Sequence, residues 1–89
     1  MYYYIYVLQS ERDKRWYTGF TMDLRKRLRE HNEGRYANSW TKTRRPFRLI
    51  YYEACNNEQD ARKREIYLKT GMGKRYLKNR LKRFLALTG

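Results

Sequence analysis

A cationic side chain and an imidazole share one side of a helix that the sequence predicts over residues 23–33. Stepping about 100° per residue along that helix places four residues together: Leu24, Arg27, Leu28 and His31. Leucines of a surface helix face the core, so Arg27 and His31 are predicted to point inward beside them. Structural explanations stay open, because Arg27 could pair with a carboxylate or lay its stem along the core, and a lone histidine is more often structural than catalytic.

A carboxylate holds a similar position on a second predicted helix. One face of that helix combines Ala61, Glu65, Leu68 and Met72. A carboxylate in an apolar stripe needs a partner, because burying it alone costs too much free energy. Glu65 would therefore either form a salt bridge with Arg27 or hold a divalent metal, since one carboxylate completed by waters and phosphate oxygens suits Mg²⁺.

Two tyrosines complete the set of residues that could carry chemistry. Tyr6 and Tyr17 lie on neighbouring predicted strands, where most tyrosines only stabilise a sheet. The sequence contains no glycine-rich phosphate loop and no paired Cys or His residues at zinc-ligand spacing. Cys55, the only cysteine, follows a strand with no histidine nearby in the sequence, which argues against a thiol nucleophile.

Three predicted strands and one short predicted helix position most of these residues. Residues rich in β-branched and aromatic side chains predict strands over 2–9, 16–20 and 47–54. The first of these strands is apolar on both alternating sides, which is typical of a central strand covered on both faces. The helix from Asp23 to about Glu33 has Thr21 as a candidate N-cap.

The ends of the remaining helices and of one loop are predicted from glycines, asparagines and a proline. Gly34 stops the first helix, and residues 35–45 form a basic loop that ends at Pro46. The second helix begins at Asn56 or Asn57 and runs to about residue 70, where two glycines break it. A third, basic helix is predicted over residues 74–87.

The predicted element order is β-β-α-β-α-α. It favours one α/β (α+β) domain over residues 1–89, with a three-stranded sheet flanked by helices.

The charge balance indicates the class of partner. Twenty-two Lys and Arg residues against nine Asp and Glu give a net charge of +13 in 89 residues. Such an excess favours nucleic acid, with an acidic membrane surface as the weaker alternative. Candidates for phosphate contacts are the basic residues of the loop and the third helix: Arg35, Lys42, Arg44, Arg45, Lys74, Arg75 and Lys78.

The N-terminus and the cysteine usage suggest a compartment. The apolar run at the start of the chain has eight residues and no basic region before it, so we expect a strand and no membrane span. A single cysteine without a signal peptide is typical of a protein in the reducing cytoplasm. No pattern calls for a small-molecule cofactor, and the oligomeric state is left open.

The ordered set of candidate residues resembles the GIY-YIG endonuclease superfamily, in particular its small stand-alone bacterial members. A YIY triplet (residues 4–6) precedes a YTG triplet (residues 17–19), and Arg27, His31 and Glu65 follow in order. The resemblance covers roughly residues 2–70. It implies a three-stranded antiparallel sheet flanked by helices and metal-dependent cleavage of a DNA phosphodiester, on a branched or damaged substrate such as DNA repair provides.

The resemblance also implies roles for the residues at the matching positions. Glu65 would hold one Mg²⁺ or Mn²⁺, and Arg27 would stabilise the transition state by charge-assisted hydrogen bonds. Tyr6 is the favoured general base, with Tyr17 positioning water or phosphate, although the sequence leaves the choice between them open. His31 would assist either tyrosine or contact phosphate.

Several positions depart from the family pattern, and a second function stays open. Tyr4 replaces the first glycine, Thr18 replaces an isoleucine, Phe20 stands where some relatives carry a lysine, and Asn79 is only a rough counterpart of a late asparagine. The alternative to a nuclease is an inactive basic nucleic-acid-binding module with the same fold. A ribosome- or RNA-associated protein would explain the charge and nothing else.

Overall fold

The computed structural model describes residues 1–35 and 39–88, and an antiparallel sheet forms its centre. The strands are β1 (Tyr3–Ser10), β2 (Trp16–Thr21) and β3 (Phe47–Cys55), arranged in the order β2-β1-β3. Both pairs are antiparallel, with Tyr6 opposite Gly19 on β2 and opposite Tyr52 on β3. The central position predicted for the first strand is confirmed, because Ile5 to Leu8 are all buried.

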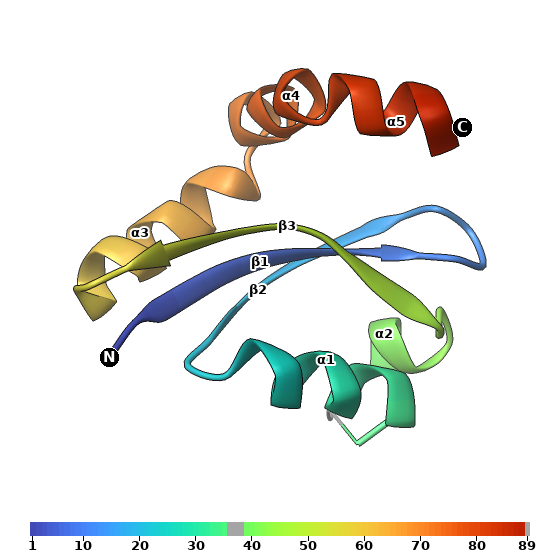
Figure 1. The fold of residues 1–89 in the computed structure, drawn as a ribbon, viewed down its shortest axis with the longest axis horizontal. Coiled ribbons are helices and arrows are strands. Elements are labelled where there is room, and N and C mark those ends of the chain that lie inside the picture. The colour runs from blue at the N-terminus through green and yellow to red at the C-terminus, as the bar shows by residue number, and fades with distance from the viewer. Residues whose placement is uncertain (36–38, 89) are drawn as a thin grey trace.

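Helices cover both faces of this sheet, as Figure 1 shows. Helices α1 (Leu24–Glu33) and α2 (Ser39–Lys42) lie on one face. Helices α3 (Glu58–Leu68), α4 (Gly71–Arg80) and α5 (Lys82–Thr88) lie on the other. The predicted fold, a three-stranded antiparallel sheet flanked by helices, is therefore confirmed. Among the described residues, no helix has the length and apolar character needed to cross a membrane.

Alternation along β1 divides the apolar interior into two layers. Ile5 and Val7 face α3 and α4, where they pack with Ala61, Leu68 and Leu77. Tyr6 and Leu8 point the opposite way and pack with residues of α1 and β3. A shift of one residue in register would exchange these two sets, so the strand fixes which side Tyr6 occupies.

The structure corrects the predicted N-cap of α1 and the predicted loop that follows this helix. Asp23, rather than Thr21, is the N-cap, and its carboxylate accepts from the backbone N–H of Lys26. Thr21 ends β2, and its hydroxyl bonds the Asp23 backbone instead. Gly34 ends the helix in the left-handed conformation as predicted, with φ of 73°. Of the predicted loop 35–45, Ser39–Lys42 form the short helix α2, and residues 36–38 lie outside the described residues.

The C-terminal prediction of one helix over residues 74–87 is wrong. Helix α4 already begins at Gly71, because the Thr70 side chain caps the N–H of Gly73. Gly73 fits there because a β-carbon would overlap the Tyr67 carbonyl oxygen, so this glycine permits close helix packing and does not break a helix. The chain then divides into α4 and α5 at Leu81.

Met72 is a further correction. It was expected on the apolar face of the second helix, but it lies in the first turn of α4 and is exposed.

Candidate active site

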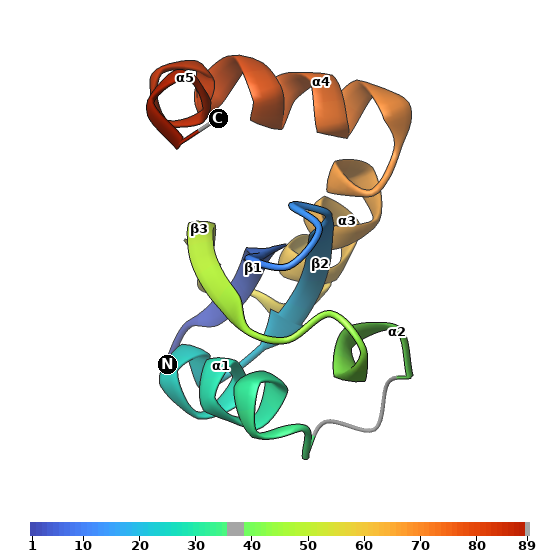
Figure 2. The same ribbon diagram turned by 90° about the vertical axis from the view of Figure 1, so that its right-hand side faces the viewer.

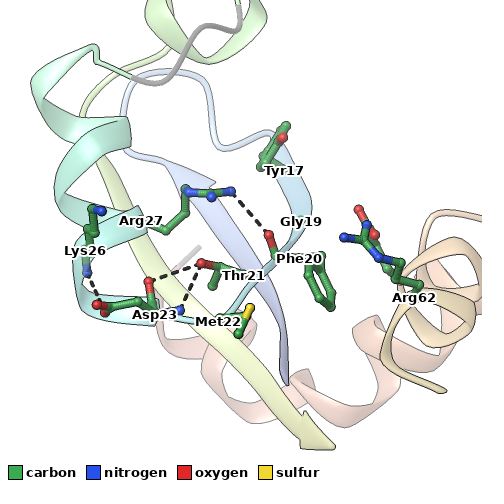
Figure 3. Close-up of a pocket in the computed structure, with 10 residues that line it drawn as sticks. Tyr17, Gly19, Phe20, Thr21, Met22, Asp23, Lys26, Arg27 and Arg62 are labelled. Carbon is green, nitrogen blue, oxygen red and sulfur yellow. Dashed lines mark hydrogen bonds between the residues drawn. The ribbon is translucent and has the colours of Figure 1, made fainter. Parts of the chain in front are cut away.

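A pocket of about 490 Å³ lies at the β2 edge of the sheet, between α1 and α3 (Figure 3). Tyr17 contributes from β2, Arg27 from α1 and Glu65 from α3. Two more cations line the same pocket, Lys26 from α1 and Arg62 from α3. Three residues that the sequence singled out therefore come together from separate elements on one basic, concave surface.

Tyr6 lies behind this pocket and does not line it. Its side chain is buried at 1% exposure, and its hydroxyl is 3.0 Å from Nε2 of His31. The Tyr6 ring lies directly over the backbone of Gly19, where a β-carbon would overlap the hydroxyl and approach Cζ to 2.5 Å. Glycine is thus needed here for a close approach between neighbouring strands, and β2 continues through it to Thr21.

His31 is buried between the two motif tyrosines. Its ring centre lies 5.0 Å from that of Tyr17 and 5.9 Å from that of Tyr6. Burial lowers the pKa of His31 to about 4, and the Arg27 cation contributes in the same direction. The imidazole is therefore neutral at neutral pH, so that one ring nitrogen carries a proton and the other carries a lone pair.

Contacts with Glu30 and with the Phe20 carbonyl hold Arg27 at the pocket wall. Nε donates to Glu30 at 3.2 Å, and Nη1 donates to the Phe20 carbonyl at 3.2 Å, drawn as a dashed line in Figure 3. The side chain keeps 25% exposure, which leaves it accessible to a ligand in the pocket. The predicted inward orientation of Arg27 is thus only partial, because the guanidinium lies at the pocket and outside the core.

Glu65 pairs with Lys69 one turn further along α3, at 3.0 Å, and is 17% exposed. Within the described part of the chain, Arg27 and Glu65 each pair with a residue of their own helix and not with each other. The salt bridge between them, which the sequence left open, is therefore not formed. Both charged groups face the pocket with partners that a ligand could replace.

Arg62 is a pocket residue that the sequence analysis missed. Its guanidinium lies 4.1 Å from the centre of the Phe20 ring, a cation–π contact, and it pairs with Glu58. Phe20 stands where some relatives carry a lysine, so Arg62 brings a cation to the same place from another element. Its spacing three residues before Glu65, on one helix face, is the signal that could have found it.

The basic residues predicted to contact nucleic acid fall into two groups. Arg35, Lys42, Arg44 and Arg45 lie at the end of α1 and around α2, where Arg35 pairs with Glu33 and Arg44 with Asp13. Lys74, Arg75 and Lys78 lie on α4, and all three are exposed. Lys74 and Lys78 line a second hollow with the two tryptophans.

The carboxylates of the pocket suit a divalent metal that keeps most of its water ligands. They do not suit a metal that is coordinated only by protein side chains. No group of three or more Asp, Glu, His or Cys residues that could hold a metal occurs among the described residues. Glu65 and Asp23 line the pocket, and Asp23 already caps α1. One available carboxylate in an open pocket matches Mg²⁺, which keeps several waters and takes substrate phosphate oxygens as ligands.

The sequence that forms this site matches a known protein family. The model of the GIY-YIG catalytic domain matches residues 2–82, which include every element from β1 to α4. The chain belongs to the GIY-YIG family. The GIY-YIG match also explains why the ordered set of tyrosines, arginine, histidine and glutamate spans so much of the sequence, since those residues lie on four different elements of the family domain.

Individual relatives agree with the family assignment. A UPF0213 protein of Syntrophus aciditrophicus is 42% identical over 66 residues, which are 74% of this chain and 75% of that protein. The UPF0213 protein YazA of Bacillus subtilis is 40% identical over 67 residues, 75% of this chain and 66% of that protein. The solution NMR structure of a UPF0213 protein from Bacillus halodurans has a TM-score of 0.52 and 34% identity, and it covers 86% of this chain and 82% of that one.

Proposed function

We propose that this protein is a divalent-metal-dependent DNA endonuclease that hydrolyses a phosphodiester bond. The observation that carries the proposal is the placement of Tyr17, Arg27 and Glu65 around one pocket. A nuclease of the GIY-YIG family needs a base, a phosphate-binding cation and a metal ligand, and these three residues supply one of each. A pure binding module has no need for a carboxylate at a surface meant for phosphates.

In the proposed reaction, Tyr17 first loses its phenolic proton to solvent, helped by the nearby cations of the pocket. Its phenolate then takes the proton of a water molecule that attacks the phosphorus atom. Tyr17 suits this role better than Tyr6, because Tyr17 lines the pocket whereas the Tyr6 hydroxyl is buried against His31. The bond from phosphorus to the leaving oxygen breaks, and that oxygen takes a proton from solvent. Tyr6 and His31 are positioning residues that hold the Tyr17 side of the pocket in place.

The cations of the pocket stabilise the negative charge that grows on the phosphate during this step. Arg27 would donate charge-assisted hydrogen bonds to the non-bridging oxygens, with Lys26 and Arg62 on either side. Glu65 would hold Mg²⁺ or Mn²⁺, which when bound supplies Lewis-acid stabilisation of the scissile phosphate. Lys69 would release Glu65 for that purpose.

The test is a nicking assay on supercoiled, linear and branched DNA with Mg²⁺ or Mn²⁺. We expect the wild type to nick DNA, and Glu65→Gln and Arg27→Ala each to lower the rate by at least about 100-fold. Glu11→Gln and Arg83→Ala serve as matched controls, because both residues are exposed and lie outside the pocket.

Two outcomes would contradict the proposal. They are the absence of metal-dependent cleavage on every DNA form, and cleavage that survives both pocket substitutions. Circular dichroism of each variant checks that the fold is retained. DNA binding without cleavage would favour the inactive binding module instead.

A further inference from the structure

The two tryptophans of the chain line a groove that begins beside Tyr17. The part nearest Tyr17 has a volume of about 200 Å³, and the next part has about 610 Å³. Trp16, Trp40 and Lys74 line both parts, and Tyr17 lines both the smaller part and the candidate active site. The groove therefore adjoins, at Tyr17, the pocket in which we place the chemistry.

Three separate regions of the fold build this groove. Trp16 begins β2, Trp40 belongs to α2, and Lys74 and Lys78 project from α4. Figure 2 shows the β1–β2 hairpin between α2 on one side and the α4–α5 pair on the other. A volume of 610 Å³ lies within the range of ligand sites, roughly 300–1,000 Å³, and is far larger than a packing defect.

The tryptophan rings are held in position. The Arg44 guanidinium lies 4.2 Å from the centre of the Trp40 ring and is itself paired with Asp13 at 3.0 Å. Arg44 also donates to the Trp40 carbonyl. Trp16 packs against the core layer that contains Ile5 and Val7. Rings fixed in this way lose little conformational freedom when a flat ligand stacks on them.

The charge of the groove selects an anionic ligand. Five cationic residues line its two parts: Lys14, Arg15, Lys69, Lys74 and Lys78. No Asp or Glu is found among the described residues that line it. Aromatic rings together with a lining of cations are the combination that binds nucleic acid through bases and phosphates at once.

A duplex cannot use such a surface fully, because its bases already stack on one another inside the helix. Only an unpaired strand exposes base faces to protein side chains. We propose that the Trp16–Trp40 groove binds an unpaired segment of DNA leading away from the scissile phosphate, with bases against the tryptophans and phosphates on the lysines. This inference rests on the proposed function and makes the substrate a DNA that carries a single-stranded region.

Tryptophan fluorescence tests the groove directly, since both tryptophans of the chain line it. The full chain is titrated in EDTA, which prevents metal-dependent cleavage, with oligo(dT) of about ten nucleotides and with a hairpin duplex of equal phosphate number. We expect oligo(dT) to quench the tryptophan emission strongly and the duplex to quench it little. An unchanged emission at saturating oligo(dT) would overturn the proposal.

Substitutions then separate stacking from simple charge attraction. Trp40→Leu should weaken oligo(dT) binding by about 5- to 100-fold and change duplex binding less than about twofold. Tyr52→Leu, at an exposed tyrosine of β3 outside the groove, is the control and should leave both affinities unchanged. Because Trp40→Leu could disturb folding, Lys74→Gln with Lys78→Gln provides a second route and should also weaken oligo(dT) binding. Equal losses for duplex and single strand in both variants would overturn the groove as a site for unpaired DNA.

The outcomes distinguish this proposal from the proposed function. Nicking of fully paired DNA with no quenching by oligo(dT) would support the nuclease and overturn the groove. Quenching and Trp40-dependent binding without any cleavage would support the groove and overturn the nuclease. Tighter binding of oligo(U) than of oligo(dT) would overturn the assignment to DNA.

Discussion

The two motif tyrosines occupy different environments, and this difference predicts different effects of removing each hydroxyl. Tyr17 faces the pocket, so Tyr17→Phe should lower the cleavage rate by about 100-fold or more. Tyr6→Phe removes a buried hydrogen bond to His31 and should cost about 1 kcal/mol of stability, with a smaller loss of rate. Single-turnover cleavage and urea unfolding measure the two effects. A Tyr6→Phe variant that loses all cleavage while Tyr17→Phe retains it would identify Tyr6 as the base.

Gly19 permits the packing that buries Tyr6. Gly19→Ala should destabilise the protein by about 1–3 kcal/mol, because its β-carbon would overlap the Tyr6 hydroxyl and the strands would have to separate. Gly71→Ala is the matched control: it also adds one methyl group, but no atom lies within 4 Å of the new β-carbon. In the first turn of α4 this control should be neutral or slightly stabilising. Equal losses in urea unfolding for both variants would contradict the steric account.

His31 predicts how stability depends on pH. Its pKa of about 4 in the folded protein lies below the ordinary value of 6.5, so the unfolded chain binds more protons between these pH values. Stability should therefore rise from pH 4 to pH 6.5, by at most about 3 kcal/mol from this residue, and the gain is complete above pH 6.5.

Comparison of urea unfolding for wild type and His31→Gln isolates that contribution. The variant should show a flatter rise between pH 5 and 6.5, where ordinary carboxylates are already ionised. The same slope in both proteins would show that His31 does not carry the effect.

At the scale of elements, an ion pair fastens α3 to the sheet. Arg64 of α3 donates to both carboxylate oxygens of Glu53 on β3, at 2.8 and 2.9 Å, and the Tyr51 hydroxyl adds a third bond. Although burial raises the pKa of Glu53, the hydrogen bonds from Arg64 and Tyr51 hold that pKa below its ordinary value. The stability that this lowered pKa supplies is present above the ordinary pKa and is lost as the pH falls through the folded-state value.

Removing that charge should weaken the docking of the helix that carries Glu65. Glu53→Gln should cost about 1–2 kcal/mol, because the charged bidentate pair is only 20–31% exposed. Glu58→Gln is the control, since its pair with Arg62 is about half exposed and should contribute less than about 0.5 kcal/mol. Thermal unfolding of the two variants checks this, and a larger loss for Glu58→Gln would contradict it.

The same scale separates what the sequence could predict from what it could not. Periodicity and capping predicted the strands and α1, since alternation along β1 and the stop at Gly34 are local properties. The helical start at Gly71 follows from the Thr70 cap, a local signal that the sequence analysis overlooked. The close contact of Gly73 with Tyr67 is a packing property that no local pattern contains. Gly73 was predicted to break a helix, but it lies inside α4.

The candidate site shows a similar division. The family-like order of residues predicted which of them come together, and Tyr17, Arg27 and Glu65 do line one pocket. The partners of Arg27 and Glu65, the burial of Tyr6 and the stacking of Arg62 on Phe20 depend on rotamers and on strand register. Those are tertiary properties, and a charged residue in an apolar stripe does not specify them.

For the whole molecule, the positive charge is distributed so that lysines remain available to phosphates. Among the ion pairs of the described residues, five use arginine and one uses lysine, the pair of Lys69 with Glu65. These five arginines therefore hold local structure or the rim of the site. Seven of the eight lysines form no ion pair within the described residues, and their counterions can be released when DNA binds. Release of those counterions on binding is what makes affinity for DNA depend on salt.

The groove predicts how steep this salt dependence is. Five cations line the groove, and Lys69 is paired with Glu65. If the other four each neutralise one phosphate of a single strand, log K should fall against log salt with a slope of about −3, or about 50-fold between 50 and 200 mM. Replacing Lys74 and Lys78 with glutamine should reduce the slope by about 1.4, because two phosphate contacts are lost. Lys63→Gln, at an exposed lysine of α3 outside the groove, should leave the slope unchanged. Fluorescence titrations with oligo(dT) at several salt concentrations measure all three slopes. A slope that falls equally in both variants would mean that the positive charge acts diffusely, without defined phosphate contacts in the groove.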